Sequence, residues 1–223
     1  MCGRFTLATP ADVLAAFFDV ESEDWIAPHY NIAPTMRIVS IGSRRGRREA
    51  RTMVWGAANP KDGRPVINAR SETVATSPLF ARAFADARIL VPADGFFEWS
   101  KDGRSRKAHY FSQPGRTPFA FAGIAVDPRR EREQEGAVLL TTAATASVAS
   151  VHDRMPVMIP PNLFDLWLDR EARIASVQKI FEVSAAIEWE SYPVGPAVNN
   201  ARNDGPENIA AAAHLPEAQS SLF

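Results

Sequence analysis

The sequence predicts a single-domain α+β fold. Residues 37–126 consist of short apolar runs separated by Gly and Pro, which is typical of strands, whereas the flanking segments carry apolar residues at helical spacing. Strands grouped in the middle of a chain, with helices on either side, favour an α+β fold. The 223 residues contain no internal repeat and no long Gly/Ser linker. We therefore expect one domain over residues 1–208 and a weakly tethered, alanine-rich tail over residues 209–223.

Three segments have helical patterns. Thr9 places a capping hydroxyl before Pro10, which suits the first helical position, and apolar residues follow at positions 13, 14, 17 and 18. This pattern predicts a short amphipathic helix. Towards the end of the chain, the same spacing predicts helices over residues 161–167 and 171–181.

The predicted strands are short. The stretch from Lys101 to Arg104 contains Asp-Gly, which tolerates the positive φ angles of a type I′ turn and predicts a hairpin between residues 96–100 and 109–112. Residues 188–192 predict one last strand. The clearest apolar strands cover residues 37–41, 89–91 and 119–126.

Composition places the chain among soluble globular proteins. Apolar residues make up 46% and charged residues 23%, close to the average of that class. No stretch approaches the roughly 18 apolar residues of a membrane span, and no signal peptide pattern is present, so we expect a cytoplasmic protein with no membrane contact. One cysteine excludes an internal disulfide and a CxxC metal site. The net charge is −1, but residues 1–107 carry +4, which permits a basic face.

The single cysteine, Cys2, follows Met1 directly. Aminopeptidases generally remove methionine when a small residue follows, which would make Cys2 the N-terminus. A terminal amine, with a pKa of about 7.7 to 8.0, is partly unprotonated at neutral pH. An aldehyde condenses with such an amine to an imine, and the adjacent thiol then closes a thiazolidine ring. The alternative is that Cys2 is a small buried hydrophobic residue.

Three polar residues alternate with other residues in the stretch PVINARSET. On a strand, Asn68, Arg70 and Glu72 would share one face. That face is either plain solvent-exposed surface or the floor of a polar cleft in which an amide, a guanidinium and a carboxylate orient a ligand. The guanidinium would suit a phosphate.

Glu98 lies between two aromatic residues in the stretch PADGFFEWS and would share a strand face with Phe96. Apolar surroundings desolvate a carboxyl and raise its pKa, so that it can hold or donate a proton near neutral pH. The alternative is an edge-strand residue that points at water.

The stretch VHDRMP places His152 and Arg154 two residues apart, ahead of Pro156. In an extended segment both side chains would point the same way and form a polar pair. Of the four histidines, only His152 has a setting typical of catalysis. No tight cluster of His and carboxylate residues has metal-ligand spacing, so we expect neither a metal nor a cofactor.

Two further features could contact nucleic acid. The run RRGRREAR over residues 44–51 is either a solvated loop or a group of guanidiniums that contact phosphates. Trp55 is either a core residue or a side chain that stacks on an exposed base.

Six stretches in sequence order, MCGRF, YNIAPT, VWG, INARSET, PADGFFEW and VHDRMPVMI, closely resemble the SRAP (SOS-response-associated peptidase) family over residues 1–208. Members of this family shield abasic sites in single-stranded DNA, because the processed N-terminal cysteine reacts with the ring-opened sugar aldehyde and leaves a stable thiazolidine crosslink. The resemblance implies one α+β domain with a twisted, largely antiparallel, barrel-like sheet, short flanking helices and a positively charged DNA channel. One departure is that VWG is followed here by small residues, where members often carry a second aromatic residue.

The resemblance also implies roles for individual residues. Cys2 would be the nucleophile, Asn68 would hold the abasic sugar, and Glu98 and His152 would move protons during ring opening, imine formation and reversal. The activity would be a lyase-like DNA–protein crosslinking, carried out by a monomer on single-stranded DNA with abasic sites or on its junctions with duplex DNA. The protein would be nucleoid-associated when bound. The residues implied to contact DNA are Arg4, Asn31, Trp55, Arg70 and Arg154.

Two alternatives remain at this stage. A cysteine peptidase would use a Cys2 thiolate and His152 to cleave a peptide bond, such as the one after Met1. A non-covalent module would bind single-stranded DNA through its arginines and Trp55, with Cys2 incidental. Crosslinking differs from both, because it needs an amine and a thiol on the same residue.

Overall fold

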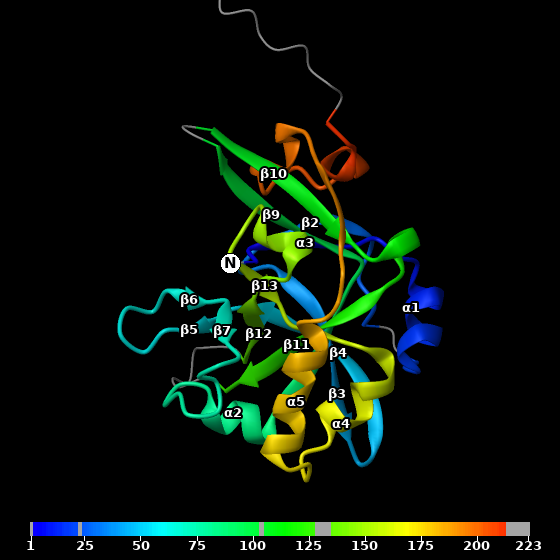
Figure 1. The fold of residues 1–223 in the computed structure, drawn as a ribbon. Coiled ribbons are helices and arrows are strands. Elements are labelled where there is room, and N and C mark those ends of the chain that lie inside the picture. Colours follow the sequence, from blue (N-terminus) through cyan, green and yellow to red (C-terminus); the bar gives the residue numbers. More distant parts are fainter. Residues whose placement is uncertain (1, 22–23, 103–104, 128–134, 213–223) are drawn as a thin grey trace, which may run out of the picture.

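The computed structural model describes residues 2–21, 24–102, 105–127 and 135–212. These residues form an α+β domain made mostly of strands, with short helices at its periphery (Figure 1). The predicted class and the twisted, largely antiparallel, barrel-like sheet are confirmed. Among the residues in these four ranges, no helix is long and apolar enough to cross a membrane.

The larger sheet closes into a barrel. Its eight strands are β3 (Arg37–Arg44), β4 (Arg47–Trp55), β7 (Asn68–Arg70), β8 (Arg88–Ala93), β11 (Phe119–Val126), β12 (Gly136–Ala143), β13 (Arg154–Pro156) and β14 (Met158–Ile159). Neighbouring strands follow the order β13-β12-β4-β3-β8-β11-β14, and β11 also pairs with β12, so that β12, β4, β3, β8 and β11 form a ring. Two of the pairings, of β12 with β4 and with β7, are parallel. Ring closure removes open edges and encloses an apolar interior.

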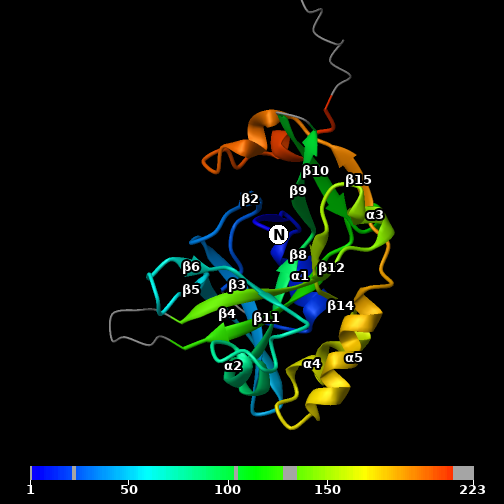
Figure 2. The ribbon, with the colours of Figure 1, turned by 60° about the vertical axis from the view of Figure 1, so that its left-hand side comes forward.

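A second sheet lies over the barrel, with the N-terminal end of the chain between the two in both views (Figures 1 and 2). Its strands are β1 (Arg4–Leu7), β2 (His29–Ile32), β9 (Gly95–Asp102), β10 (Ser105–Ser112) and β15 (Glu190–Pro193). They are antiparallel, in the order β15-β10-β9-β1-β2. The predicted hairpin is confirmed as β9 and β10, and its turn at residues 103–104 lies outside the described residues. A short separate ribbon consists of β5 (Ala57–Ala58) and β6 (Pro65–Val66).

The helices are short and lie on the outside. They are α1 (Ala11–Phe18), α2 (Ala81–Asp86), α3 (Ala146–Ala149), α4 (Phe164–Leu168) and α5 (Ile174–Ser184), with 3-10 turns at Pro114–Arg116, Pro161–Leu163, Pro196–Asn199 and Pro206–Ile209. Helices α4 and α5 lie together beside one flank of the barrel (Figure 2). The two helices predicted near the end of the chain are confirmed, although the first begins as a 3-10 turn and the second begins at Ile174.

The start of α1 differs from the prediction. The helix begins at Ala11 with Pro10 as its N-cap residue, and no side chain caps it. The Thr9 hydroxyl instead donates a hydrogen bond to Asp94 Oδ2 (2.9 Å), which also accepts from the backbone N–H groups of Ala8 (2.7 Å) and Thr9 (2.8 Å). Because Asp94 is buried, its carboxylate fixes the end of β1 against the start of β9.

The register of β1 sets the position of the chain's first residues. Phe5 pairs with Phe96 of β9 and packs edge-on against Trp55 at a ring-centroid distance of 5.1 Å. Both partners of Phe5 are fully buried. Continuing the antiparallel register from Phe5 towards the N-terminus places Gly3 opposite Glu98, so Cys2 lies one residue beyond the position that faces Glu98.

The basic run over residues 44–51 is not a loop. It forms the tip and one strand of the β3–β4 hairpin, at the end of the barrel away from the N-terminus (Figure 1). Two of its arginines form ion pairs with other segments, Arg48 with Asp165 (2.6 Å) and Arg51 with Glu135 (2.7 Å). The expected solvent exposure holds for most of the run, whose other arginines are exposed, but the run is a strand hairpin and not a loop.

The predicted tail is described only at its start. The N–H of Ala212 donates to the carbonyl of Pro193 (2.9 Å), and Ala211 forms a bridge with Val194. Residues 209–212 are thus attached to the end of β15. Residues 213–223 lie outside the described residues, and their weak tethering stays a prediction.

Candidate active site

Cys2 leads into β1 and is fully buried. Its carbonyl accepts a hydrogen bond from Asn68 Nδ2 of β7 (2.8 Å), and its thiol donates to the Arg4 carbonyl (3.6 Å). Burial raises the pKa of the Cys2 thiol well above its usual range, and the negative charge of Glu98 raises it further. The thiol is therefore protonated at neutral pH, and the two sheets both contribute to its position.

Glu98 lies on β9 and is 2% exposed, on the strand face that also carries Phe96. Desolvation raises the pKa of the Glu98 carboxyl, while positive charge at His152 acts in the opposite direction. The predicted apolar surroundings are confirmed, and the alternative of a side chain that points at water is wrong. A carboxyl in this setting keeps its proton at pH values where an ordinary glutamate is ionised.

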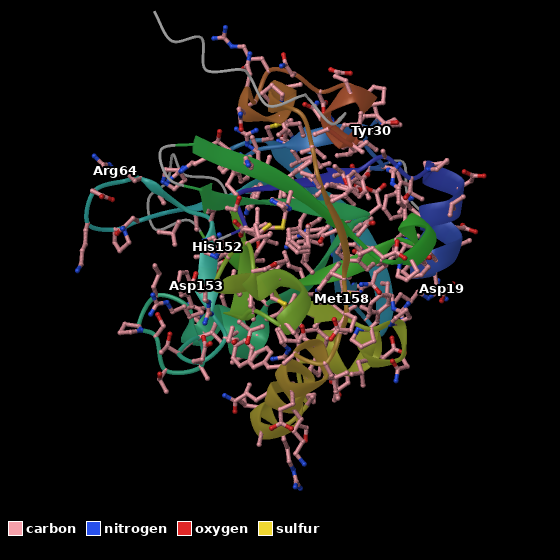
Figure 3. All side chains as sticks on the ribbon, turned by 45° about the horizontal axis from the view of Figure 1, so that its top comes forward. Asp19, Tyr30, Arg64, His152, Asp153 and Met158 are labelled. Carbon is pink, nitrogen blue, oxygen red and sulfur yellow. The ribbon has the colours of Figure 1, made fainter. Side chains whose placement is uncertain are left out.

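His152 lies in the turn between α3 and β13, next to Asp153 (Figure 3). Its Nδ1 atom accepts a hydrogen bond from the backbone N–H of Arg154 (3.0 Å) and lies 2.9 Å from Asp153 Oδ1. One nitrogen cannot accept and donate at once, so the first contact requires an Nδ1 without a proton and the second an Nδ1 that carries one. The ring thus has a partner for either state of Nδ1, and it lies within electrostatic reach of Glu98.

Arg154 does not form the expected side-chain pair with His152. Strand β13 begins only at Arg154, and its guanidinium binds the carboxylate of Glu72 through Nη1–Oε1 (2.5 Å) and Nη2–Oε2 (2.9 Å). Arg70 of β7 is exposed and also acts electrostatically on Glu72. We call Arg70, Glu72 and Arg154 the arginine rim. Asn68 contacts Cys2 from the same segment, so this residue of the polar stretch is not plain surface. That the stretch forms the floor of a ligand cleft stays a prediction.

Two of the residues expected to contact DNA have structural contacts instead. Asn31 is fully buried, and its Nδ2 donates to the carbonyls of Asn200 (3.1 Å) and Asn203 (2.8 Å). Its Oδ1 accepts from Arg4 Nη1 (2.8 Å), which also donates to the Val198 carbonyl (2.7 Å). A DNA contact by Asn31 is therefore wrong for this conformation, because its amide ties the C-terminal segment to β2. Arg4 takes part in the same network through one nitrogen of its guanidinium, Nη1.

Trp55 is the second correction. Its ring is fully buried, and Nε1 donates to the carbonyl of Ile67 (3.1 Å). Its face is covered by Phe5. Stacking on an exposed base is therefore wrong for this conformation, and the core alternative holds, because the hydrogen bond and the aromatic contact together satisfy this side chain in the interior.

A groove adjoins the predicted site, and a larger cavity lies elsewhere on the fold. A shallow groove of about 580 Å³ lies beside β9 and β10 and is lined by Gly3, Arg4, Trp99, Arg106 and Asn199. A larger cavity of about 1270 Å³ lies near the β3–β4 hairpin tip, and none of the predicted site residues lines it. Within the described ranges, no three His, Cys, Asp or Glu side chains are grouped so as to hold a metal ion.

His109 is a site neighbour that the sequence did not reveal. It pairs with Glu98 across β9 and β10, so the two side chains project from the same face. Burial lowers the pKa of His109, and the positive charge of Lys107 lowers it further. The Asp-Gly turn was the available signal. Counting outward from Asp102 and Gly103 as the central turn residues, however, would have placed Lys107 opposite Glu98, because the observed register pairs Asp102 with Ser105.

The barrel and the site together define a class of protein. A buried, protonated thiol at the second residue lies within electrostatic reach of a desolvated carboxyl, and Asn68, which binds the Cys2 carbonyl, lies on the same strand as Arg70 of the arginine rim. The chain belongs to the SOS response associated peptidase (SRAP) family, whose model matches residues 1–201.

Similar proteins share most of their length with this chain. The abasic site processing protein YedK of Escherichia coli K12 is 32% identical over 222 residues, which cover 94% of this chain and 99% of YedK. The abasic site processing protein YoqW of Bacillus subtilis is 30% identical over 224 residues, with the same coverage of 94% and 99%. A crystal structure of a protein from Bacteroides thetaiotaomicron has a TM-score of 0.80 at 20% identity and covers 95% of this chain and 100% of its own. This last likeness shows the shared fold.

Proposed function

We propose that this protein acts on abasic sites in single-stranded DNA and that it does so by forming a covalent crosslink through Cys2. The names of YedK and YoqW support abasic-site processing, and both relatives match over nearly the whole chain. After removal of Met1, the Cys2 amine and thiol would capture the aldehyde of the ring-opened abasic sugar. The protein would act as a monomer and need no cofactor.

The observation that carries this proposal is the placement of Cys2. Its carbonyl is held by Asn68, and its thiol lies within electrostatic reach of Glu98, a carboxyl with a raised pKa. Residues from the two sheets thus converge on the amino acid that can offer an amine and a thiol to one carbon atom. A lone cysteine that served only to fill the core would need neither partner.

The reaction is balanced by the loss of one water molecule. The amine nitrogen attacks the aldehyde carbon to give a carbinolamine, and loss of its hydroxyl as water gives the imine. The sulfur of the thiol then adds to the imine carbon, while the thiol proton passes to the imine nitrogen. Two new bonds, carbon–nitrogen and carbon–sulfur, form at one carbon and close the thiazolidine ring.

Glu98 is suited to both proton transfers. In its protonated form it can donate to the departing hydroxyl, and as a carboxylate it can accept the thiol proton and return it to nitrogen. The Cys2 thiol is protonated at neutral pH because of its raised pKa, so this second transfer is needed. His152, which acts electrostatically on Glu98, would exchange protons with it, and Asn68 would hold the reacting residue in place through its hydrogen bond to the Cys2 carbonyl.

The same raised pKa argues against the peptidase alternative. A cysteine hydrolase needs a thiolate at neutral pH, and such cysteines lie in electropositive, partly exposed surroundings that lower the thiol pKa. Cys2 has the opposite setting, since it is buried and lies close to a carboxylate.

The test is to incubate purified protein with a single-stranded oligonucleotide that holds one abasic site. Denaturing electrophoresis and intact mass analysis should reveal an adduct with the mass of the protein without Met1, plus the DNA, less one water. Without a reductant, Cys2→Ala should give no stable adduct. Cys2→Ala and Cys2→Ser both keep the amine but lack the thiol, so each should give an adduct only when borohydride reduces the imine.

A further variant distinguishes thiazolidine crosslinking from non-covalent DNA binding. Inserting one residue between Met1 and Cys2 keeps the thiol but blocks the amine, and it should abolish the adduct. An adduct that survives this insertion would rule out the thiazolidine chemistry. If fully processed protein gives no adduct but binds abasic and intact DNA alike, the protein is a non-covalent binding module.

A further inference from the structure

We propose that the Glu72 carboxylate occupies a phosphate-binding site formed by Arg154 and Arg70, and that a DNA phosphate must displace it. Glu72 would then set how tightly the protein holds DNA that carries no abasic site. This inference rests on the proposed DNA-binding function and extends it to a residue that limits affinity.

Glu72 occupies the edge of the Arg154 guanidinium that is formed by its two terminal nitrogens. Both terminal nitrogens of its guanidinium bind the two oxygens of Glu72, at 2.5 and 2.9 Å. Nη2 also donates to the Thr141 carbonyl (2.6 Å) and hydroxyl (3.3 Å), and Nε is buried without a hydrogen-bond partner among the described residues. A phosphate can use the same two-pronged geometry, because carboxylate and phosphate oxygens match the guanidinium fork alike. It can do so only when Glu72 has moved away.

The exposure of the two side chains indicates which partner moves. The Arg154 side chain is 16% exposed and is anchored to Thr141 of β12, whereas the Glu72 side chain is 49% exposed. Glu72 also lies beyond the end of β7, in a turn. The arginine is therefore a fixed base, and the carboxylate covers it from the solvent side and can rotate into water.

The charges around Glu72 are those of an anion site. The pKa of Glu72 is held below its usual range, first by the hydrogen bonds from Arg154 and also by the positive charge of Arg70, while partial burial acts in the opposite direction. Two guanidiniums thus act on one carboxylate. With Glu72 in place the arginine rim carries a net charge of +1, and without its carboxylate charge the rim would carry +2.

The experiment measures non-covalent binding of the full chain to an oligonucleotide without abasic sites, over a range of salt concentrations. Glu72→Gln should bind about three- to tenfold more tightly at low salt, because one repulsive charge is lost and the fork is freed. The slope of log Kd against log salt concentration should steepen by about 0.7, the value for one additional phosphate contact on single-stranded DNA. Glu72→Asp keeps the charge and should stay close to the wild-type slope.

The matched control is Glu171→Gln, which changes the net charge equally at an exposed residue just ahead of α5. It should leave the affinity and the slope unchanged. If Glu72→Gln binds DNA less tightly than wild type or with the same slope, Glu72 supports Arg154 and does not compete with phosphate, and the inference is overturned. Crosslinking of abasic DNA by wild type is measured in parallel. If the wild-type protein neither binds DNA nor crosslinks abasic DNA, the proposed function is overturned as well. If the wild-type protein crosslinks abasic DNA but Glu72→Gln has the wild-type affinity and salt slope, only this inference is overturned.

Discussion

The site has a buried interior, formed by Cys2 and Glu98, and the arginine rim, and these two regions differ in their electrostatics. Inside, Cys2 and Glu98 are 0% and 2% exposed, and loss of water is the largest influence on the pKa of both groups. At the rim, the Glu72 side chain is 49% exposed, and pairing with Arg154 is the largest influence on its pKa. Burial thus keeps protons on the interior groups, while pairing removes the proton from Glu72.

This difference indicates that pH and salt concentration should act on different parts of the site. Exposed charges are screened by salt, whereas buried groups are screened much less. Conversely, Glu98 has a pKa moved towards neutrality, while Glu72 has one moved away from it. We therefore expect pH to change the rate of the chemistry and salt to change the affinity for DNA.

The largest effect should come from Glu98→Gln, which keeps the shape of the side chain and removes its titrating proton. Adduct formation on abasic DNA should slow by roughly 10²-fold or more, the usual contribution of general acid–base catalysis. The wild-type rate should depend on pH above the ordinary glutamate range, whereas the variant should lose this dependence. Single-turnover rates between pH 5 and 8 measure both.

The pH dependence of protein stability provides a second test of the Glu98→Gln substitution. Because the folded-state pKa of Glu98 is raised from 4.5, the native protein holds a proton that the unfolded chain releases as pH rises above 4.5. Wild-type stability should therefore fall as pH rises through that window, and Glu98→Gln should escape the loss. Glu182→Gln, at an exposed position on α5, is the control and should keep the wild-type dependence of stability on pH.

The kinetic experiment can also contradict the role of Glu98. If wild type and Glu98→Gln form the adduct at equal rates at every pH, Glu98 takes no part in the proton transfers.

A smaller effect is expected from Asn68→Ala, which removes the hydrogen bond to the Cys2 carbonyl. One such bond contributes about 0.5 to 1.5 kcal/mol, so the adduct rate should fall by about two- to twelvefold. Affinity for intact DNA should hardly change, since the amide faces Cys2 and not the rim. Asn162→Ala, at an exposed position in the turn before α4, should leave both quantities unchanged. If Asn68→Ala lowers only the affinity for intact DNA and leaves the adduct rate unchanged, Asn68 acts in DNA binding like the arginine rim and does not position Cys2.

Local patterns in the sequence predicted much of the fold. The apolar runs gave the strands that became β3, β8 and β11, and Asp-Gly gave the β9–β10 hairpin. The helix cap at Thr9 was wrong because the hydroxyl bonds to Asp94, which is 85 positions away in the chain. Local propensity cannot include a competing partner that only the folded chain brings near.

For the site, as for the fold, local sequence patterns indicated individual residues but not contacts between residues that are distant in the chain. Alternation with Phe96 indicated apolar surroundings for Glu98 but left open a side chain that points at water, and only the folded structure, in which Glu98 is buried, decided between them. The pairing of Glu72 with Arg154 was not predictable, because the two residues are 82 positions apart and each is equally suited to a phosphate or to water. Trp55 left two alternatives open, and only the packing of Phe5 against its ring decided between them.

The smallest effect should come from Arg70→Gln, which tests the rim without touching the interior. Loss of one exposed charge should weaken binding to intact single-stranded DNA by about two- to fivefold and lower the salt slope by about 0.7. The adduct rate at saturating abasic DNA should stay at the wild-type value, since Arg70 has no part in proton transfer. Arg44→Gln is the control, because Arg44 is 72% exposed at the hairpin tip at the far end of the barrel. If Arg44→Gln lowers the slope as much as Arg70→Gln, DNA extends over the basic run, and the boundary between interior and rim no longer describes how the protein binds it.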